Sequence, residues 1–310
     1  MSYSIKSIRE DFKSKGVFYT DEKLARLLAS YIPSDATEVY DPTCGGGNLL
    51  AVFPDHVRKY GQEINEAQAE ECARRLVNCD VAKGDTLHCP AFFDRKFRHI
   101  VANYPFSIKW DSGAHENDPR FRAAPCLPPP SKADYAFIMH ILYMLEDGGT
   151  AATLNFPGIL YRGQREGKIR RWVVEQNLVD RVELFEGGYF EDTNIGTALI
   201  IFKKGRTKNT VTFADHENGL EREVQLYEIV ENGYSLNVSN YIQPEEPDRW
   251  ADFDVVATER LARNNVLGRL KLQLEFSKSA IELHEMMGLP PLPPLSEFIQ
   301  DIHNLTKQYQ

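Results

Sequence analysis

Residues 41–48 form the first stretch with a possible role in chemistry. They read Asp-Pro-Thr-Cys-Gly-Gly-Gly-Asn and begin where a short strand, predicted over 38–41, ends. Glycines at such a strand exit let the backbone turn tightly and come close to a ligand. A plain tight turn accounts for the same residues, so this stretch alone leaves both interpretations open.

A second acid indicates that the ligand is a nucleoside. Glu63 lies 22 positions after Asp41, at the predicted end of the next strand, 57–63. An acid about 20 residues on accepts hydrogen bonds from ribose hydroxyls in nucleoside-binding sheets. No Gly-Lys-Ser or Gly-Lys-Thr follows the glycines, which excludes a Walker-type phosphate loop. Asp41 suits a ligand that carries an amino group or a positive charge, and S-adenosylmethionine has both and a ribose.

Two further strand ends carry polar residues. Asp85 closes a predicted strand, 81–85, where it could accept a hydrogen bond from an adenine amino group. A helix-capping or turn aspartate is an equal alternative for this residue. Residues 103–106 read Asn-Tyr-Pro-Phe and follow a fourth predicted strand, 99–102. Together with the Asp-Pro-Thr-Cys-Gly loop, this tetrad resembles the amino-methyltransferases, whose signature is Asn/Asp/Ser-Pro-Pro-Tyr/Phe.

Four more stretches resemble the modification (M) subunit of type I restriction–modification systems. They are Gly-Val-Phe-Tyr-Thr at 16–20, Ala-Asp-Tyr-Ala-Phe at 133–137 with His140, Asn-Phe-Pro-Gly-Ile-Leu at 155–160, and Tyr-Ser-Leu-Asn-Val-Ser-Asn-Tyr at 234–241. Their order also matches that subgroup, because the Phe-Tyr-Thr segment comes before the cofactor loop and the tetrad. The resemblance covers roughly residues 7–245.

The resemblance implies methylation of adenine N6 in double-stranded DNA, with S-adenosylmethionine as the methyl donor. The side-chain carbonyl of Asn103 and the main-chain carbonyl of Tyr104 would hold both amino hydrogens, which frees the nitrogen lone pair. Phe106 would stack on a base flipped out of the duplex. The catalytic set is Asn103, Tyr104, Pro105 and Phe106. The cofactor-binding set is Phe18, Tyr19 and Thr20 beside the methionine end, with Asp41, Thr43, Gly45, Gly47, Asn48, Glu63, Asp85, Leu87 and Asn103.

One position departs from the family signature, since Tyr104 stands where the family has proline. A backbone carbonyl survives that change, and a residue before a proline stays extended. We expect less rigidity there and a bulkier side chain near the pocket. This leaves open a catalytically weak or inactive methyltransferase-fold protein, an assembly or decoy partner of a restriction system. Methylation of a glutamine amide in a protein is a further alternative, because the same tetrad serves that reaction.

The elements that must position these residues alternate between strand and helix. Such alternation predicts a parallel sheet with helices on both faces. The resemblance makes this α/β fold a seven-stranded, mostly parallel, Rossmann-like methyltransferase sheet. The predicted strands are 38–41, 57–63, 81–85, 99–102, 151–156, 179–185 and 197–202, the last two as a closing antiparallel pair. The predicted helices are 7–13, 21–31, 48–53, 65–77, 133–145 and 164–176.

Two segments break this pattern. Residues 107–132 contain five prolines and form a long loop, which either covers the target base or is a disordered insertion. A composition shift at 243–247 divides a methyltransferase domain, 1–245, from a C-terminal helical extension, 246–310. The extension is predicted to be helical over 251–287, and it either packs on its own sheet or docks on a partner helix. Its 65 residues leave no space for a target-recognition domain, a role that a separate specificity subunit fills in the family.

The charge balance bears on partners. The chain has 36 basic and 45 acidic residues, a formal net charge of −9. A protein that grips nucleic acid unaided usually has an excess of Lys and Arg, so a local basic surface or a helper subunit is needed here. One basic group is a candidate for phosphate contact, and a solvated helix face is the equal alternative. This group is Arg162, Arg165, Lys168, Arg170 and Arg171.

Cysteines and histidines bear on compartment and metals. The five cysteines are scattered without a Cys-x-x-Cys pair, which disfavours a disulfide framework or a zinc knuckle and fits the cytoplasm. The eight histidines form no ligand-spaced pair on one helix face, so we expect no metal. We interpret His140 as a satisfied core side chain. No apolar stretch reaches about 18 residues, so no membrane span is expected.

Overall fold

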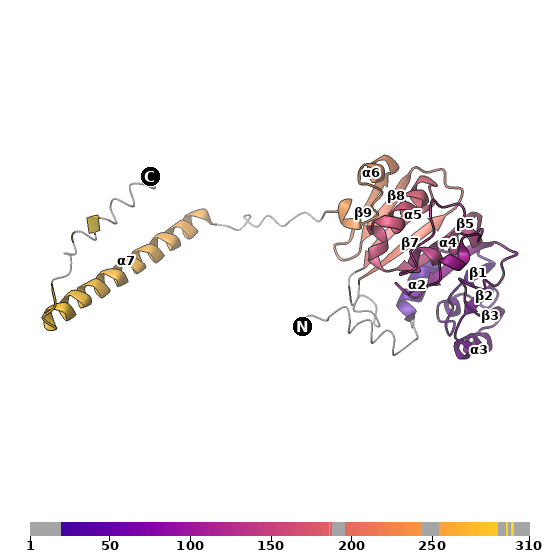
Figure 1. The fold of residues 1–310 in the computed structure, drawn as a ribbon, viewed down its shortest axis with the longest axis horizontal. Coiled ribbons are helices and arrows are strands. Elements are labelled where there is room, and N and C mark those ends of the chain that lie inside the picture. The colour runs from indigo at the N-terminus through magenta and orange to yellow at the C-terminus, as the bar shows by residue number, and fades with distance from the viewer. Residues whose placement is uncertain are drawn as a thin grey trace. The chain divides into compact units, whose positions relative to one another are not determined.

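The computed structural model describes residues 20–185, 187, 196–243, 254–290, 296 and 299–300. The chain divides into two compact units, Met1–Pro244 and Glu245–Gln310. The first unit is built on one sheet (Figure 1). Its strands are β1 (Glu38–Asp41), β2 (Arg58–Glu63), β3 (Cys79–Lys83), β4 (Phe97–Asn103), β5 (Leu145–Asn155), β6 (Val179–Phe185), β7 (Thr197–Lys203), β8 (Thr210–Asp215) and β9 (Leu220–Gln225).

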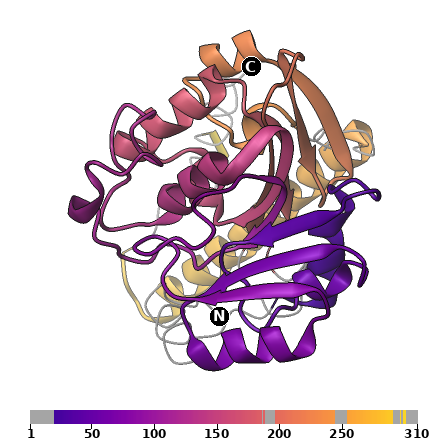
Figure 2. The same ribbon diagram turned by 90° about the vertical axis from the view of Figure 1, so that its right-hand side faces the viewer.

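The strand order is β3-β2-β1-β4-β5-β7-β6-β8-β9, and the strands lie side by side in one sheet (Figure 2). Pairing is parallel from β3 through to β5, and β7 runs antiparallel to both β5 and β6. The antiparallel pairing of β6 with β7 is therefore confirmed, but the pair does not close the sheet, because β8 and β9 lie beyond β6. The chain leaves β1 toward β2 on one side and returns to β4 on the other, so the carboxyl ends of β1 and β4 flank a topological switch point.

The expectation of seven strands is wrong, because the sheet has nine and is mixed. The two additional strands, β8 and β9, form an antiparallel pair, and β8 runs parallel to β6. Val211 and Phe213 of β8 are buried, whereas β9 is exposed at every position except Val224. A polar edge strand of this kind carries no apolar run, and so the sequence pattern did not reveal it.

Helices cover both faces of the sheet, as alternating burial along the strands requires. In β4, Ile100 and Ala102 belong to one core cluster and Val101 to the other. The first cluster includes residues of α4, α5 and α6, and the second includes residues of α2 and α3. The helices are α2 (Glu22–Ser30), α3 (Glu66–Arg75), α4 (Asp134–Met144), α5 (Gln164–Glu175) and α6 (Leu226–Glu231), with 3₁₀ turns η1 (Leu50–Val52), η2 (Gly113–His115), η3 (Pro157–Leu160) and η4 (Val238–Asn240).

Two predicted elements differ in detail from the observed ones. The predicted helix at 48–53 is only the short η1, and β3 ends at Lys83, before Gly84 and Asp85. Gly84 has a φ of +137°, a region that L side chains rarely adopt, so the strand ends there. The predicted helix at 7–13 lies outside the described residues.

The long segment 107–132 is folded, so the alternative of a disordered insertion is wrong. Trp110 and Phe121 are buried within the larger core cluster. The indole Nε1 of Trp110 donates to the carbonyl of Pro129 at 3.1 Å. Both ends of the segment therefore close on one another, which places a compact loop between the tetrad and α4.

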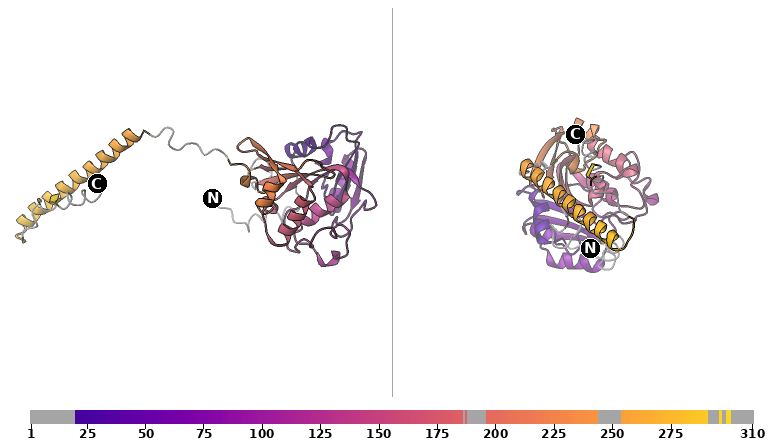
Figure 3. Two further views of the ribbon diagram at one scale, coloured as in Figure 1. Left: turned by 90° about the horizontal axis from the view of Figure 1, so that it is seen from above. Right: turned by 90° about the vertical axis from the view of Figure 1, so that its left-hand side faces the viewer.

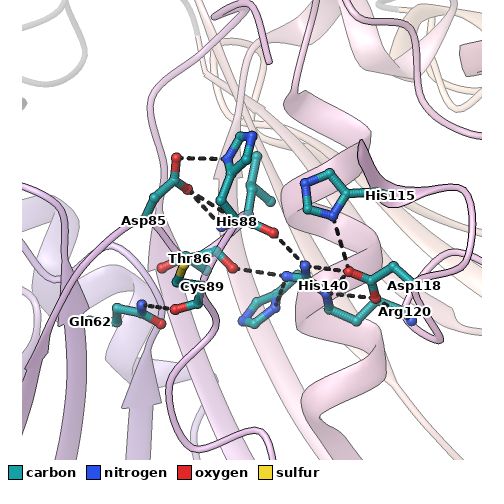
Figure 4. Close-up of polar contacts among 10 residues, drawn as sticks. Gln62, Asp85, Thr86, His88, Cys89, His115, Asp118, Arg120 and His140 are labelled. Atoms are coloured by element: carbon teal, nitrogen blue, oxygen red, sulfur yellow. Dashed lines mark hydrogen bonds and ion pairs between the residues drawn. The ribbon is translucent and has the colours of Figure 1, made fainter. Parts of the chain in front are cut away.

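Arg120 anchors this loop from inside (Figure 4). Its guanidinium donates to the carbonyls of Thr86 (2.8 Å) and Leu87, and to Asp118 Oδ2 (2.6 Å). It also lies 3.1 Å from Nδ1 of His140, whose Nε2 is 3.2 Å from the Tyr40 hydroxyl. Burial, with the nearby Arg120 charge, lowers the pKa of His140 to about 3. His140 is thus a neutral core side chain that receives the arginine's hydrogen bond.

In the second unit the described helix is α7 (Val255–Met286), one continuous helix in every view (Figure 3). Asp254 caps it, because its side chain accepts a hydrogen bond from the Ala257 amide at 2.9 Å. The predicted helix at 251–287 is confirmed over the described part. Within the described residues, none of the helices is both long and apolar enough to cross a membrane.

The Arg120 network generates a stability prediction. Arg120→Met leaves the two buried carbonyls without this donor and removes the ion pair with Asp118, so we expect a loss of roughly 3–5 kcal/mol in the free energy of unfolding. Arg122→Met is the matched control, since Arg122 is exposed in the same loop, and it should change stability by less than about 0.5 kcal/mol. Urea denaturation of both variants measures the difference, and equal losses would contradict the anchoring role.

Candidate functional site

A pocket lies at the carboxyl edge of the sheet, where β1 and β4 end side by side. Six of its lining residues belong to the predicted set and four do not. The predicted ones are Thr20, Asp41, Thr43, Gly45, Asn48 and Asn103. The others are Cys44, Gly46, Gln68 and Glu71. The two sites that the sequence suggested separately, the glycine loop and the tetrad, therefore share one pocket.

The glycine loop forms one wall of the pocket, and its backbone adopts φ values that residues with a side chain rarely adopt. Gly45 and Gly47 have φ values of +53° and +85°. A Cβ on Gly47 would lie 2.7 Å from the Cys72 sulfur and 2.9 Å from Cδ1 of Leu76. The loop therefore needs glycine at position 47 for conformation and for space, since α3 packs directly against it.

Glu63 fixes this loop rather than lining the pocket. One carboxylate oxygen accepts a hydrogen bond from the Gly45 amide at 2.9 Å, and the other accepts from the Asn65 amide at 2.7 Å. Asn65 in turn caps α3, since its side chain accepts from the Gln68 amide at 3.2 Å. The acid at the end of β2 thus holds together the glycine loop and the start of α3.

Asp41 is a buried carboxylate on the pocket wall, 2% exposed. Its Oδ1 accepts a hydrogen bond from the Thr43 amide at 2.9 Å. Burial and the nearby Glu63 charge raise the pKa of Asp41 to about 7, against the lowering effect of the Thr43 amide. A cation in the pocket would favour the ionised form of this group, because opposite charges attract strongly at a buried site.

Asn103 presents the most direct chemical signal in the pocket. Its side-chain Nδ2 donates to Thr20 Oγ1 at 3.2 Å, while its Oδ1 is buried and has no hydrogen-bond partner among the described residues. Leaving a buried acceptor unpaired costs roughly 1–3 kcal/mol, so such atoms are rare and call for an explanation. An oxygen of this kind, at the wall of a pocket, is an acceptor held ready for a donor.

Thr20 closes the pocket over Asn103 and the glycine loop. Besides its hydroxyl contact with Asn103, its carbonyl accepts a hydrogen bond from Asn48 Nδ2 at 3.4 Å. Asp21 begins α2 and caps it by accepting from the Leu24 amide at 2.7 Å. Phe18 and Tyr19, expected beside Thr20, lie outside the described residues.

Comparison with known proteins establishes the family. Residues 3–224 match the N-6 DNA methylase family. The MpnII type I restriction enzyme methylase subunit of Mycoplasma pneumoniae is 35% identical over 241 residues, which cover 68% of this chain and 44% of that protein. The chain belongs to the N-6 DNA methylase family.

Further similarities agree with this assignment. The MjaIX methylase subunit of Methanocaldococcus jannaschii is 27% identical over 228 residues, covering 66% of this chain and 41% of that protein. A crystal structure of the methyltransferase subunit of a type I restriction–modification system from Streptococcus thermophilus superposes with a TM-score of 0.67 at 29% identity, covering 73% of this chain and 59% of that one. The resemblance to M subunits is confirmed, and the chain spans less than half the length of these two curated relatives.

Four described residues of the predicted cofactor set do not line the pocket. Gly47 and Glu63 form or hold the glycine loop, and the other two are Asp85 and Leu87. Asp85 accepts hydrogen bonds from the Leu87 amide (2.8 Å) and pairs with Nδ1 of His88 (2.9 Å), so it stabilises a turn, as Figure 4 shows. Leu87 is buried in the core and 2% exposed. Spacing along the chain placed Asp85 and Leu87 near the sheet edge, but local hydrogen bonds engage the first and core packing buries the second, and neither lines the pocket.

The expectation of a bulky Tyr104 side chain near the pocket is wrong. The ring is fully buried in the core, stacked on Phe137 with ring centroids 5.0 Å apart. Phe106 lies edge-on to Tyr104, with centroids 6.0 Å apart. Tyr104 is not among the residues that line the pocket, so its ring does not narrow it.

The basic group on and before α5 divides into buried and exposed members. Arg170 is buried and donates to the carbonyls of Tyr234 (2.8 Å) and Arg162 (2.7 Å). Arg162 lies 3.4 Å from Glu166, and Arg171 pairs with Glu175 at 2.7 Å. Within the described residues, only Arg165 and Lys168 of this group are exposed and form no ion pair. Because Arg170 is buried, it is neither a phosphate contact nor part of a solvated helix face.

The sequence analysis did not predict Gln68 and Glu71 of α3 as residues of the pocket. Their spacing of three places both on one helix face, and the first lies just inside the helix cap at Asn65. That spacing, directly after Glu63, was the available signal. Within the described residues, no group of three histidine, cysteine or carboxylate side chains is arranged to hold a metal ion.

Asp41 generates a pH-dependent stability prediction. Its folded pKa near 7 lies above the value of 3.8 for a free carboxyl, so the folded chain binds more protons between these pH values and loses stability as pH rises. Asp41→Asn removes this penalty and keeps the Thr43 contact. We expect the variant's gain in unfolding free energy to be roughly 2–3 kcal/mol larger at pH 8 than at pH 5.

Urea denaturation of the ligand-free protein at the two pH values measures this gain. Other titrating groups are common to the parent chain and the variant, so they cancel in the difference. A gain that is the same at both pH values would show that Asp41 titrates at its ordinary value.

Proposed function

We propose that the chain transfers a methyl group from S-adenosylmethionine to the N6 amino group of an adenine flipped out of double-stranded DNA. The observation that carries the proposal is the unpartnered Oδ1 of Asn103 in a pocket shared with the glycine loop. An adenine amino group offers two hydrogens and a delocalised lone pair. Fixed acceptors for both hydrogens orient the nitrogen and favour the lone pair for attack.

The residues of the pocket fit S-adenosylmethionine. When bound, this cofactor supplies an electrophilic methyl group on a sulfonium centre. The buried carboxylate of Asp41 and the carboxylate of Glu71 give the pocket an acidic wall that suits its cationic groups. The glycine backbone allows close approach, and Glu63 fixes that loop. Ile64, 69% exposed beside Glu63, offers an apolar face to an adenine ring.

The tetrad supplies the groups for the target base. Asn103 Oδ1 accepts one amino hydrogen, and the main-chain carbonyl of Tyr104 accepts the other. Phe106, partly buried between the two core clusters, stacks on the base, and the folded loop 107–132 covers it. No side-chain nucleophile is required, because the amino nitrogen would itself attack the methyl carbon of the cofactor, with the thioether as the leaving group and one amino proton released.

The partners follow from charge and family. The chain has a formal net charge of −9, which disfavours unaided binding to DNA. We therefore propose a separate specificity subunit that recognises the DNA sequence. The helix α7 is the segment proposed to contact that subunit. A methyltransferase-fold binding protein without catalysis, and a protein glutamine methyltransferase, are the alternatives that the experiment must separate.

The decisive experiment follows labelled methyl from S-adenosylmethionine into methyl-free DNA, with nucleoside analysis of the product. The product should be N6-methyladenine. Asn103→Ala removes one of two acceptors, so transfer should fall about 10²–10³-fold while cofactor binding is kept. The matched control is Asn232→Ala at the end of α6, outside the pocket, which should leave the rate unchanged.

Other outcomes identify the alternatives. Label that appears in a glutamine side chain of an added protein would favour the protein methyltransferase. Cofactor binding without transfer to DNA or protein would favour the binding protein. Equal activity in Asn103→Ala and the parent chain would contradict the role of the amide in the reaction.

Cofactor binding should depend on pH through Asp41. Because the pKa of Asp41 is about 7 and a bound cation favours its ionised form, affinity should weaken as pH falls below 7. We expect the dissociation constant for S-adenosylmethionine at pH 6 to be roughly five- to tenfold higher than at pH 7.5. Titration calorimetry measures it, and Asp41→Asn should flatten the dependence. The same slope in the variant would assign the pH effect to another group.

A further inference from the structure

The residue that departs from the family signature is firmly anchored inside the core. Tyr104 is fully buried, and its ring stacks on Phe137 of α4 at an interplanar angle of 14°. Its ring also meets the edge of Phe106 at 89°. The side chain therefore leaves the tetrad on the side away from the pocket and is held on two sides by aromatic rings.

The Tyr104 hydroxyl has a single fixed acceptor, since it donates to Oδ1 of Asn155. Asn155 is fully buried at the carboxyl end of β5, and β5 pairs directly with β4. Its Nδ2 donates to the Thr153 carbonyl (2.9 Å), to Thr153 Oγ1 (3.0 Å) and to the Ala198 carbonyl (3.2 Å). Because Nδ2 of Asn155 is engaged by Thr153 and Ala198, its Oδ1 lies on the other side of the amide and faces Tyr104.

The hydroxyl of Thr153 fixes this orientation further. It donates its hydrogen to the Ile200 carbonyl at 3.2 Å, so toward Asn155 it acts as an acceptor. The amide of Asn155 therefore cannot turn over without losing hydrogen bonds in a buried site. A chain of contacts runs from β7, through Thr153 and Asn155, to the hydroxyl of Tyr104.

The backbone that directly follows the tetrad is restrained by a different side chain, Asp134. The Ser107 amide donates to both carboxylate oxygens of Asp134 at 3.2 Å, and Ser107 has a φ of +53°. Between the end of β4 and this turn, residue 104 is free of the proline ring that fixes φ in the family signature. Its side chain is thus the element that can restrain the peptide there.

We propose that Tyr104 and Asn155 are a positioning pair, which holds the main-chain carbonyl of residue 104 toward the amino group of the target adenine. The inference rests on the proposed function. The stacked and hydrogen-bonded ring restrains the Cα–Cβ bond and hence the adjoining peptide, which replaces the restraint that a proline gives. Misplacing a reacting group by about 1 Å can cost about 10²-fold in rate, so a small loss of restraint is measurable.

The test compares Tyr104→Phe with a matched control, Tyr135→Phe. Both variants remove one hydroxyl from a buried tyrosine, because the Tyr135 hydroxyl donates to the Ile159 carbonyl at 3.0 Å. Both should lower the urea midpoint by similar amounts. Tyr104→Phe should also lower kcat for methyl transfer about 10- to 100-fold, with the dissociation constant for S-adenosylmethionine unchanged. Tyr135→Phe should keep kcat within about twofold of the parent chain.

A second measurement does not need activity. Amide hydrogen exchange of a peptide spanning 103–110 should be faster in Tyr104→Phe and unchanged in Tyr135→Phe. Adding Asn155→Leu to Tyr104→Phe should slow transfer by no further factor, because the two residues act as one unit. If the two substitutions reduced the transfer rate by multiplying factors, the proposal that Tyr104 and Asn155 act as a pair would be contradicted.

The outcomes separate this inference from the proposed function. Unchanged exchange at 103–110 in Tyr104→Phe overturns the pair, whether or not the parent chain transfers methyl groups. Absence of transfer by the parent chain to any acceptor overturns the proposed function, and faster exchange in the variant would still support the pair. Reduced kcat with unchanged cofactor binding and faster exchange supports both.

Discussion

The parallel pairing of β1 with β4 is the constraint on which the site depends. Residues 41 and 103 are far apart in the chain, yet both stand at the carboxyl edge, because the register of these strands aligns Tyr40 with Ile100. The chain moves outward from β1 in one direction and resumes at β4 in the other, which makes this edge the topological switch point of the sheet. The pocket lies there, and the pairing brings Asp41 at the end of β1 together with Asn103 at the end of β4.

This arrangement keeps polar groups in places that weaken the folded state. Asp41 is buried with a raised pKa, and Asn103 Oδ1 is buried without a partner. Each costs free energy in the ligand-free chain, and each is relieved by a ligand of the right charge or hydrogen-bonding type. The burial of apolar side chains in two large core clusters, on opposite faces of the sheet, offsets that cost. The unfavourable groups therefore mark the site as clearly as any sequence signature does.

The surroundings of the tetrad are rigid for a similar reason. Loop 107–132 is closed by Trp110 and anchored by the buried Arg120, so it forms a fixed structure beside the site. Asp134 fixes the turn after the tetrad, and Asn155 receives the Tyr104 hydroxyl. Phe137 of α4 and Asn155 of β5 both contact Tyr104 within the tetrad. A tyrosine in the place of proline is compatible with the site because the core, rather than the pocket, accommodates its ring.

The sequence by itself determined the parts of this protein that local rules control. The alternation of strands and helices predicted most strands. The glycine loop, the acid 22 positions later, the Asn-Tyr-Pro-Phe tetrad and the four other motif stretches predicted the family and six residues of the pocket wall. Tertiary structure alone decided the direction of side chains and the extent of the sheet. Asp85 turned to His88, Leu87 entered the core, Tyr104 pointed away from the pocket, and β9 joined as a polar edge strand. These outcomes depend on neighbours distant in the chain, since burial and hydrogen-bond partners are set only when the sheet, the helices and the loop are packed together.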